Sequence, residues 1–409
     1  MSRLYRTLVL PYHFLWAFLS AAYYGFPAKK LTVIGVTGTK GKSSVSEMLY
    51  AVLTDSGHTA ALAGTIRFAI GAQSEPNLYK MTLPGHGFIQ RFLARAVREG
   101  ATHAIVELTS EGALQYRHAF LSLDALIFTN LQEEHLESHG SFEKYFRAKF
   151  RIARALARSG KRPRAIIANA GDPRGKDFLA LPVEDRLPFS FSDAAAAVVR
   201  DDGVSFLYRD TRFDVPHPGR FTVMNALAVI RTSLWLGIPV DAIARALAAV
   251  KRIAGRAERI EAGQDFIAVV DYAHTPDSLR AIYGAYKDRR KVCVLGNTGG
   301  GRDVWKRPLM GGIADEACAE VFLTDEDPYD ENPESIVEAM AKGMKRAPRI
   351  IMDRREAIRA ALRAARAGDA VLITGKGTDP FIMRAKGAKE PWSDARVVRE
   401  ELERLRTES

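Results

Sequence analysis

The sequence predicts an α/β fold with two domains, each built around a largely parallel sheet. From residue 31 to residue 130, apolar strand-like runs alternate with helical patterns, which is typical of βαβ units. The same alternation begins again near residue 253. In both halves, polar or glycine-bearing residues directly follow the strands, and open α/β sheets bind their ligands at that edge. A chain of 409 residues is long enough for two or three such domains.

The chain begins with an apolar and aromatic stretch, "LVLPYHFLWAFLSAAYYGF", which follows Arg3 and Arg6. Pro11 and His13 interrupt it, so it is marginal for a membrane span of about 20 residues. Three interpretations stay open at this point. The stretch is a helix docked on the first domain, an interfacial helix that contacts a membrane surface through residues 8–26, or a signal peptide that ends at "SAA".

The first half contains three clear strands, "LTVIGV", "HAIVEL" and "DALIFTN". Apolar residues at helical spacing predict a helix over Val45–Leu53, ended by Gly57. Further along, "AAAAVVRDDGVSFLYRDTRFDV" predicts a small antiparallel insert around an Asp-Asp-Gly turn. Two helices follow the insert, at about Thr222–Gly237 and Asp241–Val250.

The second half contains five strands, each of which ends in polar or glycine-bearing residues: "DFIAVVDYAHT", "KVCVLGN", "AEVFLTDED", "RIIMD" and "DAVLITGKG". The only two cysteines, Cys293 and Cys318, have neither C-x-x-C nor metal-site spacing. This usage argues against a disulfide framework and favours a reducing cytoplasm.

The formal net charge of +11 suits an anionic ligand, such as a nucleotide, a nucleic acid or an acidic membrane surface. Many of the bases lie on helix-like stretches such as "RFLARAVREG", where they are interpreted as solvated helix faces. Clusters of aromatic and basic residues are missing from the sequence, so no nucleic-acid partner is expected.

The stretch "VTGTKGKSSVSEML" places a glycine-bearing loop between a strand and a helix. Gly38 and Gly41 allow a tight turn, and the N-terminus of the helix offers backbone N–H groups to a phosphate. Lys42 would reach the β- and γ-phosphates of a nucleotide, and Ser43 would offer its hydroxyl to Mg²⁺. The spacing differs from G-x-x-x-x-G-K-[ST], since Val36 stands five residues before Gly41, and an ordinary basic turn is the alternative.

Three further residue groups follow the strands of the first half. Glu107 would offer carboxylate oxygens to Mg²⁺, although taken alone it is an ordinary acid at a strand end. His135 and His139 are spaced like a zinc pair, but no third ligand of matching spacing is evident. Lys149 would by default be a surface lysine on an amphipathic helix.

Eight motifs occur in a specific order: "GVTGTKGKSS", "VELTS", "FTNLQEEHLESHGSFEKYFRAKF", "PGRFTVMNALA", "GRAERI", "VDYAHTPDSL", "RDVWKRPLMG" and "GKG". This order resembles the Mur ligases of peptidoglycan synthesis, and most closely the MurE type, which adds the third residue of the stem peptide. The family uses a shortened G-T-x-G-K-[ST] loop. The resemblance implies a central P-loop ATPase domain with a parallel sheet (31–253) and a C-terminal Rossmann-like α/β domain (254–409), after an apolar helical segment (1–30).

The resemblance also implies roles for individual residues. The ATP-binding set is Gly38, Thr39, Lys40, Gly41, Lys42, Ser43, Ser44, Asn225, Arg256, Asp271 and His274. The catalytic set is Lys42, Glu107, His135 and Lys149. Two Mg²⁺ ions would be held by Ser43, Glu107, His135 and a carbamylated Lys149. The acceptor and the amino acid would be bound by Thr82, Thr109, Ser110, Arg117, Arg302, Asp327, Tyr329, Gly375 and Asp379.

The implied reaction is ATP-dependent formation of an amide bond. ATP converts the acceptor carboxylate to an acyl phosphate, the amine of an amino acid attacks it, and phosphate leaves. The implied partners are small molecules, namely a muropeptide such as UDP-MurNAc-L-Ala-D-Glu and an amino acid. The protein is expected to be a cytoplasmic monomer.

The sequence departs from the family pattern in ways that leave the substrates open. About thirty residues stand where the family has a UDP-binding domain of roughly one hundred residues, so a lipid-linked acceptor is an alternative. "EDPY" replaces D-N-P-R and "GKGTD" replaces G-K-G-H-E. Tyr329 thereby replaces an arginine, and Glu326, Asp327 and Asp379 suit a cationic side chain, so lysine is as consistent as diaminopimelate. Two other functions compete: a folylpolyglutamate synthetase, and a nucleotide-binding subunit without ligase activity.

Overall fold

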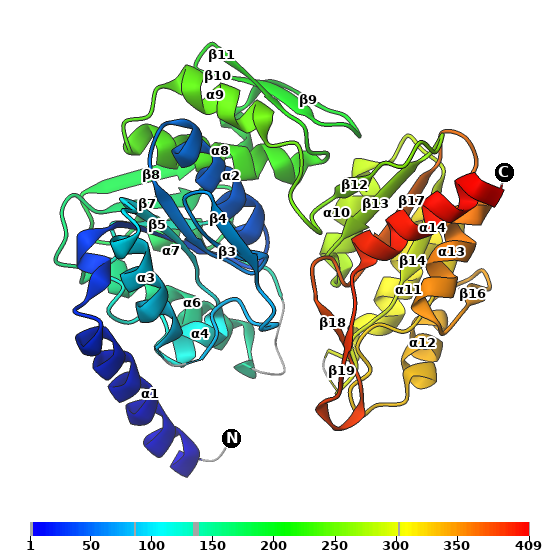
Figure 1. Ribbon diagram of the computed structural model, residues 1–409, viewed down its shortest axis with the longest axis horizontal. Helices are drawn as coiled ribbons and strands as arrows, with labels where there is room; N and C mark the ends of the chain where they lie inside the picture. Colours follow the sequence, from blue (N-terminus) through cyan, green and yellow to red (C-terminus); the bar gives the residue numbers. More distant parts are fainter. Residues whose placement is uncertain (1–2, 86, 134–138, 302, 409) are drawn as a thin grey trace. The chain divides into compact units, whose positions relative to one another are not determined.

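Parallel sheets form the centre of both halves of the chain. The computed structural model describes residues 3–85, 87–133, 139–301 and 303–408 (Figure 1). The chain divides into two compact units. Unit 1 comprises Met1–Val198, Ser205–Val215 and Phe221–Val250, and unit 2 comprises Val199–Val204, Pro216–Arg220 and Lys251–Ser409.

The sheet of unit 1 has the strand order β4-β3-β2-β5-β1-β6-β7-β8. β2, β5, β1, β6, β7 and β8 run parallel, whereas β3 and β4 form an antiparallel extension. The strands are β1 (Thr32–Thr37), β2 (Ala60–Ala63), β3 (Arg67–Ile70), β4 (Gln73–Pro76), β5 (His103–Glu107), β6 (Ala125–Phe128), β7 (Ala165–Asn169) and β8 (Asp185–Phe189). The three strands predicted in this half are β1, β5 and β6, which are neighbours.

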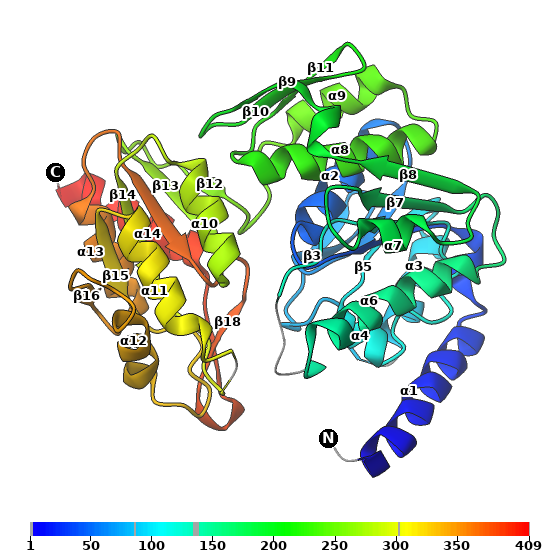
Figure 2. The same ribbon diagram turned by 180° about the vertical axis from the view of Figure 1, so that it is seen from behind.

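Helices cover this sheet because its central strands are apolar on both faces. The helices of unit 1 are α1 (Arg3–Tyr23), α2 (Lys42–Asp55), α3 (Phe88–Arg98), α4 (Ser110–Leu114), α6 (Phe142–Ala157), α7 (Gly175–Leu179), α8 (Arg220–Trp235) and α9 (Val240–Ala249), with 3₁₀ turns η1 (Pro27–Lys30) and η2 (Phe191–Asp193). α3, α6 and α7 pack on one core with β1, β5 and β6 (Figure 2). α2 packs against β1, β2 and β5, and also against α9.

The predicted insert is a three-stranded sheet of order β11-β10-β9. Its strands are β9 (Ala195–Val199), β10 (Val204–Tyr208) and β11 (Thr211–Val215), and the predicted Asp-Asp-Gly turn joins the first two. β11 packs against α9. The two helices predicted after the insert are α8 and α9.

α1 is a helix that includes Pro11 and runs out from the rest of unit 1 (Figure 1). The ring centroids of Phe14 and Phe18 lie 5.5 and 5.6 Å from that of Phe120. Ala21 is buried, whereas most of the preceding residues for which burial is described are exposed. Among the described residues, no helix has the length and apolar character that crossing a membrane requires.

The main sheet of unit 2 has the strand order β12-β13-β17-β14-β15-β16, in which only β12 is antiparallel to its neighbour. The strands are β12 (Glu258–Ile260), β13 (Ile267–Asp271), β14 (Lys291–Leu295), β15 (Glu320–Leu323), β16 (Arg349–Ile350) and β17 (Ala370–Thr374), and a separate pair consists of β18 (Phe381–Met383) and β19 (Lys389–Pro391). The five strands predicted from the sequence are β13 to β17.

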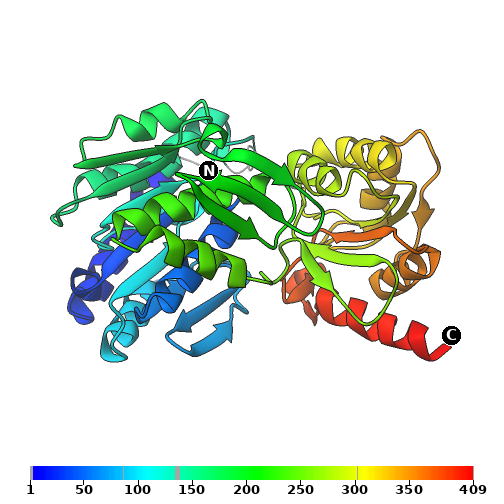
Figure 3. The same cartoon turned by 90° about the horizontal axis from the view of Figure 1, so that it is seen from above.

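Helices lie on both faces of this sheet (Figure 3). They are α10 (Pro276–Ala285), α11 (Lys306–Ala317), α12 (Pro333–Ala341), α13 (Arg354–Ala364) and α14 (Asp394–Glu408), with a 3₁₀ turn η3 (Ala385–Gly387). α10, α11 and α12 share one core with Cys293 and Leu372, while α13 and α14 share the other with Val294 and Ile373. Successive residues of the central strands therefore point into different cores, and the middle of each of these strands is apolar.

The cysteine usage argued against a disulfide framework, but Cys293 and Cys318 form a disulfide in this structure. Cys293 lies in β14, and Cys318 precedes β15, the parallel neighbour of β14. Both side chains are buried in the core with α10, α11 and α12. Spacing along the chain carried no sign of this pairing, since the sheet brings the two residues together.

Candidate functional site

The loop between β1 and α2 is held in shape by Asn130, which follows β6. Lys40 N donates to Asn130 Oδ1 at 3.0 Å, Thr39 N donates to Asn130 O at 2.8 Å, and Asn130 Nδ2 donates to Lys40 O at 3.1 Å. Gly41 has φ 84°, and a Cβ at this position would lie 2.4 Å from Asn225 Oδ1. Glycine is thus required here both for its backbone conformation and for space.

Two lysine ammonium groups converge on this loop. Lys42 Nζ donates to Gly38 O at 3.0 Å and to Thr39 O at 2.9 Å, and Lys149 Nζ donates to Gly38 O at 2.7 Å. α2 begins at Lys42, and Gly41 before it provides no side-chain cap. A helix N-terminus without a side-chain cap, beside two lysine side chains, is a favourable environment for phosphate.

Lys149 is buried, although its position on an amphipathic helix, taken alone, predicts a surface lysine. Its side chain is only 2% exposed, and its Nζ lies 4.8 Å from the centroid of the Tyr145 ring. The hydroxyl of Tyr145 is hydrogen-bonded to Thr39 Oγ1 at 3.1 Å, so α6 is joined to the loop by two side chains. The contact of Lys149 with Gly38 spans 111 positions of sequence.

Glu107 ends β5 beside the first turn of α2. Its Oε2 accepts hydrogen bonds from Ser43 Oγ at 3.1 Å and from Thr65 Oγ1 at 2.9 Å, while Oε1 accepts one from Thr65 N at 2.9 Å. Thr65 Oγ1 also lies 2.9 Å from Thr82 Oγ1. Ser43, Glu107 and Thr82, which were predicted separately, therefore belong to one connected group of oxygen atoms.

The predicted zinc pair is only partly within the described residues, because His135 lies outside them. His139 is buried, and its Nε2 is hydrogen-bonded to Ser110 Oγ at 3.1 Å. Across the described residues, no group of three or more His, Cys, Asp and Glu side chains could hold a metal ion.

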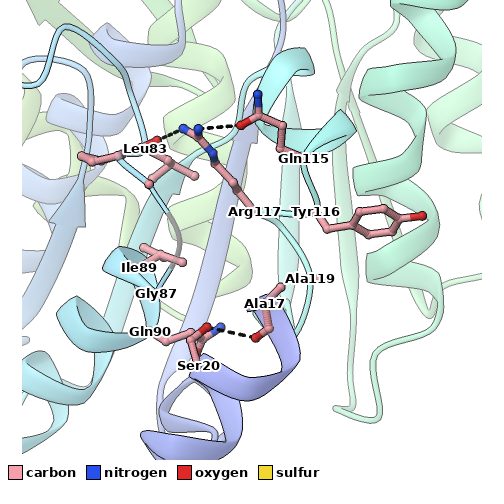
Figure 4. Close-up of a pocket in the computed structure, with 12 residues that line it drawn as sticks. Ala17, Ser20, Leu83, Gly87, Ile89, Gln90, Gln115, Tyr116, Arg117 and Ala119 are labelled. Atoms are coloured by element: carbon pink, nitrogen blue, oxygen red, sulfur yellow. Dashed lines mark hydrogen bonds between the residues drawn. The ribbon is translucent and has the colours of Figure 1, made fainter. Parts of the chain in front are cut away.

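Arg117 lies in a pocket with residues from α1 and from the loop before α3 (Figure 4). Its guanidinium donates to Gln115 Oε1 at 2.5 Å and to the carbonyl oxygen of Leu83. Thr109 caps α4, since its Oγ1 accepts from Gly112 N at 3.1 Å. Thr82 lies near Arg117, because the next residue, Leu83, accepts the hydrogen bond from the Arg117 guanidinium.

The remaining predicted nucleotide residues lie in unit 2. The guanidinium carbon of Arg256 is 4.6 Å from the centroid of the Tyr272 ring. Asp271 accepts hydrogen bonds from Ala257 N and Ala273 N, both at 2.7 Å, and burial raises the pKa of its carboxyl group despite these bonds. His274 Nδ1 donates to the carbonyl oxygen of Tyr272 at 2.7 Å.

The acidic residues of unit 2 that were predicted to suit a cationic substrate face a cation of the chain itself. Lys376 Nζ lies 2.9 Å from Asp327 Oδ1 and 3.4 Å from Asp379 Oδ2. Glu326 is 2% exposed, and burial raises the pKa of its carboxyl group. A Cβ on Gly375 would lie 2.0 Å from Glu326 Oε2, so glycine is required there. Tyr329 has φ 54° and donates its N–H to Met383 O at 3.2 Å, whereas Arg302 lies outside the described residues.

Comparison with known proteins decides the family. Residues 36–233 match the Mur ligase middle domain, and residues 255–377 match the Mur ligase glutamate ligase domain. The chain belongs to the Mur ligase family.

Two relatives illustrate the similarity. The UDP-N-acetylmuramoyl-L-alanyl-D-glutamate--2,6-diaminopimelate ligase of Caldanaerobacter subterraneus is 34% identical over 94% of this chain and 80% of its own length. The ligase of the same name from Gloeobacter violaceus is 37% identical over 95% of this chain and 81% of its own length. A solved structure of a ligase of this name has a TM-score of 0.63 and 29% identity, over 92% of this chain and 79% of its own. This Mur ligase is therefore an acid–amino-acid ligase, and it is similar to ligases of the MurE type.

Sequence reasoning missed three residues of this Mur ligase that position the predicted ones. Asn130 could have been found, since it directly follows a strand. Lys376 could have been found inside "GKG". Thr65, which holds Glu107 across 42 positions of sequence, carries no local signal.

Proposed function

We propose that this Mur ligase couples an amino acid to the free carboxylate of a muropeptide acceptor in peptidoglycan synthesis, with ATP as the activating substrate. The observation that carries the proposal is the start of α2, where Lys42 and Lys149 converge beside the Ser43–Glu107 hydrogen bond. Relatives named for UDP-N-acetylmuramoyl-L-alanyl-D-glutamate and 2,6-diaminopimelate support the choice of substrates.

The phosphates of ATP would lie against the loop of Gly38–Ser44 and the N-terminus of α2. Mg²⁺ fits beside them, because the Ser43 hydroxyl and the Glu107 carboxylate supply the oxygen ligands that this ion prefers. When bound, the ion would neutralise charge on the phosphates. Asn225, Arg256, Asp271 and His274 would bind the nucleoside and the remaining phosphate oxygens.

The reaction would proceed in two steps. An oxygen of the acceptor carboxylate attacks the γ-phosphorus, the bond to the β-phosphate oxygen breaks, and an acyl phosphate and ADP result. The amine then attacks the carbonyl carbon, loses a proton, and inorganic phosphate leaves. Lys42 would stabilise the charge of the transferred phosphoryl group. Thr82, Thr109, Ser110 and Arg117 would hold the acceptor.

We also propose a second ion, held by His135 and by a carbamylated Lys149. The buried position of Lys149 Nζ, 2.7 Å from Gly38 O in the phosphate-binding loop, supports this, because a carbamate there would present carboxylate oxygens, which Mg²⁺ prefers. A Lys149→Ala variant should be inactive and regain turnover when a short carboxylic acid such as formate is added. If formate gives no recovery while Lys149→Arg keeps wild-type turnover, Lys149 acts as a cation and the carbamylation proposal fails.

The amino acid would be bound by Arg302, Asp327, Tyr329, Gly375 and Asp379, and we propose a diamino acid. The protein would act as a cytoplasmic monomer with its domains at 31–253 and 254–409. We further propose that residues 8–26 contact a membrane surface.

A panel of acceptors and amino acids, incubated with ATP and Mg²⁺ and followed by mass spectrometry, tests the function. A muropeptide product with acceptor-dependent ADP release is expected, and Lys42→Ala should lower the rate at least about 100-fold. Lys287→Ala, which removes an exposed lysine, is the matched control. A product formed only with a folate acceptor, or ATP hydrolysis at the same rate with and without an acceptor, would refute the proposal.

A further inference from the structure

The exposed side chains of α1 are apolar to an unusual degree for the surface of a protein. Seven large apolar residues are at least two-fifths exposed in the part of α1 whose burial is described: Tyr12, Phe14, Leu15, Trp16, Phe18, Leu19 and Tyr23. We call these residues the α1 patch. Contiguous exposed apolar surface of this kind marks an interaction site.

A second exposed apolar stretch lies in the loop that carries Thr82. Leu78, Tyr79 and Met81 are each about half exposed. Met81 Sδ lies 3.9 Å from Arg117 Nη1, so this loop borders the Arg117 pocket. The α1 patch borders the same pocket from the other side, because Ala17 and Ser20 of α1 line it (Figure 4).

The pocket between these two apolar stretches is lined by both apolar and polar side chains. The Arg117 guanidinium is one lining group, and Gln90 is another. Gln90 is 2% exposed, and its Oε1 has no hydrogen-bond partner in the part of the chain that the structure describes. The cavity volume of about 20 Å³ admits a group of about the size of water, such as a hydroxyl or one carboxylate oxygen.

The surface around the α1 patch is basic. Lys29 and Lys30 in η1 follow α1 directly, and both are exposed. Arg91 and Arg98 are exposed on α3, which contacts both α1 and η1. The exposed acid nearby, Glu99, is paired with Arg95 at 2.7 Å. Basic residues beside exposed tryptophan, tyrosine and leucine are complementary to an anionic lipid surface.

We propose that the α1 patch docks on an anionic bilayer, with α1 in the plane of the interface, and that the acceptor is carried by a lipid in that bilayer. The Arg117 pocket then receives a polar group of the acceptor at the membrane surface. This inference rests on the proposed function, because it assigns the acceptor to the same site. It gives the chemical class of the acceptor as a carboxylate joined to a lipid.

The test compares a Leu15→Asp/Leu19→Asp variant of the full chain with the wild type. Both leucines are about half exposed, so the substitutions leave the core of unit 1 intact. Val198→Asp is the matched control, since Val198 is 48% exposed on β9, outside α1. Binding is measured by co-sedimentation with vesicles of phosphatidylglycerol and phosphatidylcholine in equal parts, and with vesicles of phosphatidylcholine alone.

The wild type and Val198→Asp should sediment with the anionic vesicles, and the double variant should bind at least about tenfold more weakly. High salt or the absence of phosphatidylglycerol should weaken binding of the wild type. Equal sedimentation of wild type and double variant would overturn the docking. The docking would also be overturned if the wild type formed a dimer in solution and did not bind vesicles, while the double variant was a monomer.

The acceptor is tested by ADP release with a soluble muropeptide and with a lipid-linked muropeptide in the anionic vesicles. The double variant should show a KM at least about tenfold higher for the lipid-linked acceptor and unchanged turnover of the soluble one. Equal KM values for both proteins would overturn the lipid-linked assignment. ADP release with neither acceptor would refute the proposed function, and the vesicle measurement would still decide the docking.

Discussion

His118 should make the stability of unit 1 fall as the solution becomes acidic. The side chain is 7% exposed, between α4 and β6. Burial, together with the smaller effect of the positive charge of Arg151, lowers its pKa from 6.5 to about 4. Its ring stacks on Tyr116 at 6.3 Å. Between about pH 4 and pH 6.5, the imidazole is therefore largely neutral in the folded protein and largely protonated in the unfolded chain.

The sign and size of the effect follow from linkage. Between the two pKa values the unfolded state binds more protons, so the free energy of unfolding decreases as pH decreases through this window. With pKa values of about 6.5 unfolded and about 4 folded, lowering the pH from about 7.5 to about 5 removes about 2 kcal/mol. At pH values above the pKa of His118 in the unfolded chain, the imidazole is neutral in both states and the free energy of unfolding no longer depends on its titration.

The assay is denaturant unfolding of the wild type and of His118→Gln at both pH values. The variant removes the titrating group, so its free energy of unfolding should decrease by about 2 kcal/mol less than that of the wild type. Other groups, including the half-buried His103, titrate equally in both proteins and cancel in the comparison. Parallel pH dependence of the two proteins would refute the reasoning.

Three further predictions follow from the structure. Gly41→Ala should abolish ligase turnover, because the added Cβ would lie 2.4 Å from Asn225 Oδ1. Gly57→Ala is the control, since Gly57 has a similar φ but open space around it; this variant should lose only about 1 kcal/mol of stability and keep its turnover. Equal loss of turnover in both variants would contradict the prediction. Arg354→Met should lower the free energy of unfolding by about 3–5 kcal/mol, since it leaves the buried Asp394 carboxylate without its ion-pair partner. The double variant Arg354→Met/Asp394→Leu should lose less stability, which would confirm that the unpaired charge is responsible. Reduction of the disulfide, which closes a separation of 25 residues, should lower the free energy of unfolding by about 3 kcal/mol in chemical denaturation, and no change on reduction would contradict the pairing.

The strands and helices that surround the candidate site could be predicted from the sequence. Segments such as "VIGV" and "AVLI" are apolar on both faces of the strand because helices cover both faces of each sheet. The loop before α2 was found because glycine, lysine and serine stand between a strand and a helix. Both signals are local, so they can be read without knowing the rest of the fold.

What the sequence did not reveal depends on contacts between distant segments. Helical spacing alone predicts a surface position for Lys149, and only the family resemblance placed it in the site; α6 carries it to Gly38 O, 111 positions away. The ion pairs of Lys376 with Asp327 and Asp379 place a lysine where a substrate cation was expected. Cys293 and Cys318 meet only because β14 and β15 are neighbours. Each outcome depends on sheet order, which local periodicity does not determine.

The position of β17 between β13 and β14 has a consequence for measuring how the molecule opens. Its residues are at most 1% exposed, and both neighbours are parallel strands. In unit 1, β1 lies in the same way between β5 and β6. Amide hydrogens at the centre of such strands exchange with deuterium only when a whole unit opens. Exchange read by mass spectrometry at these two strands would therefore report the opening free energy of each unit separately, in one intact chain.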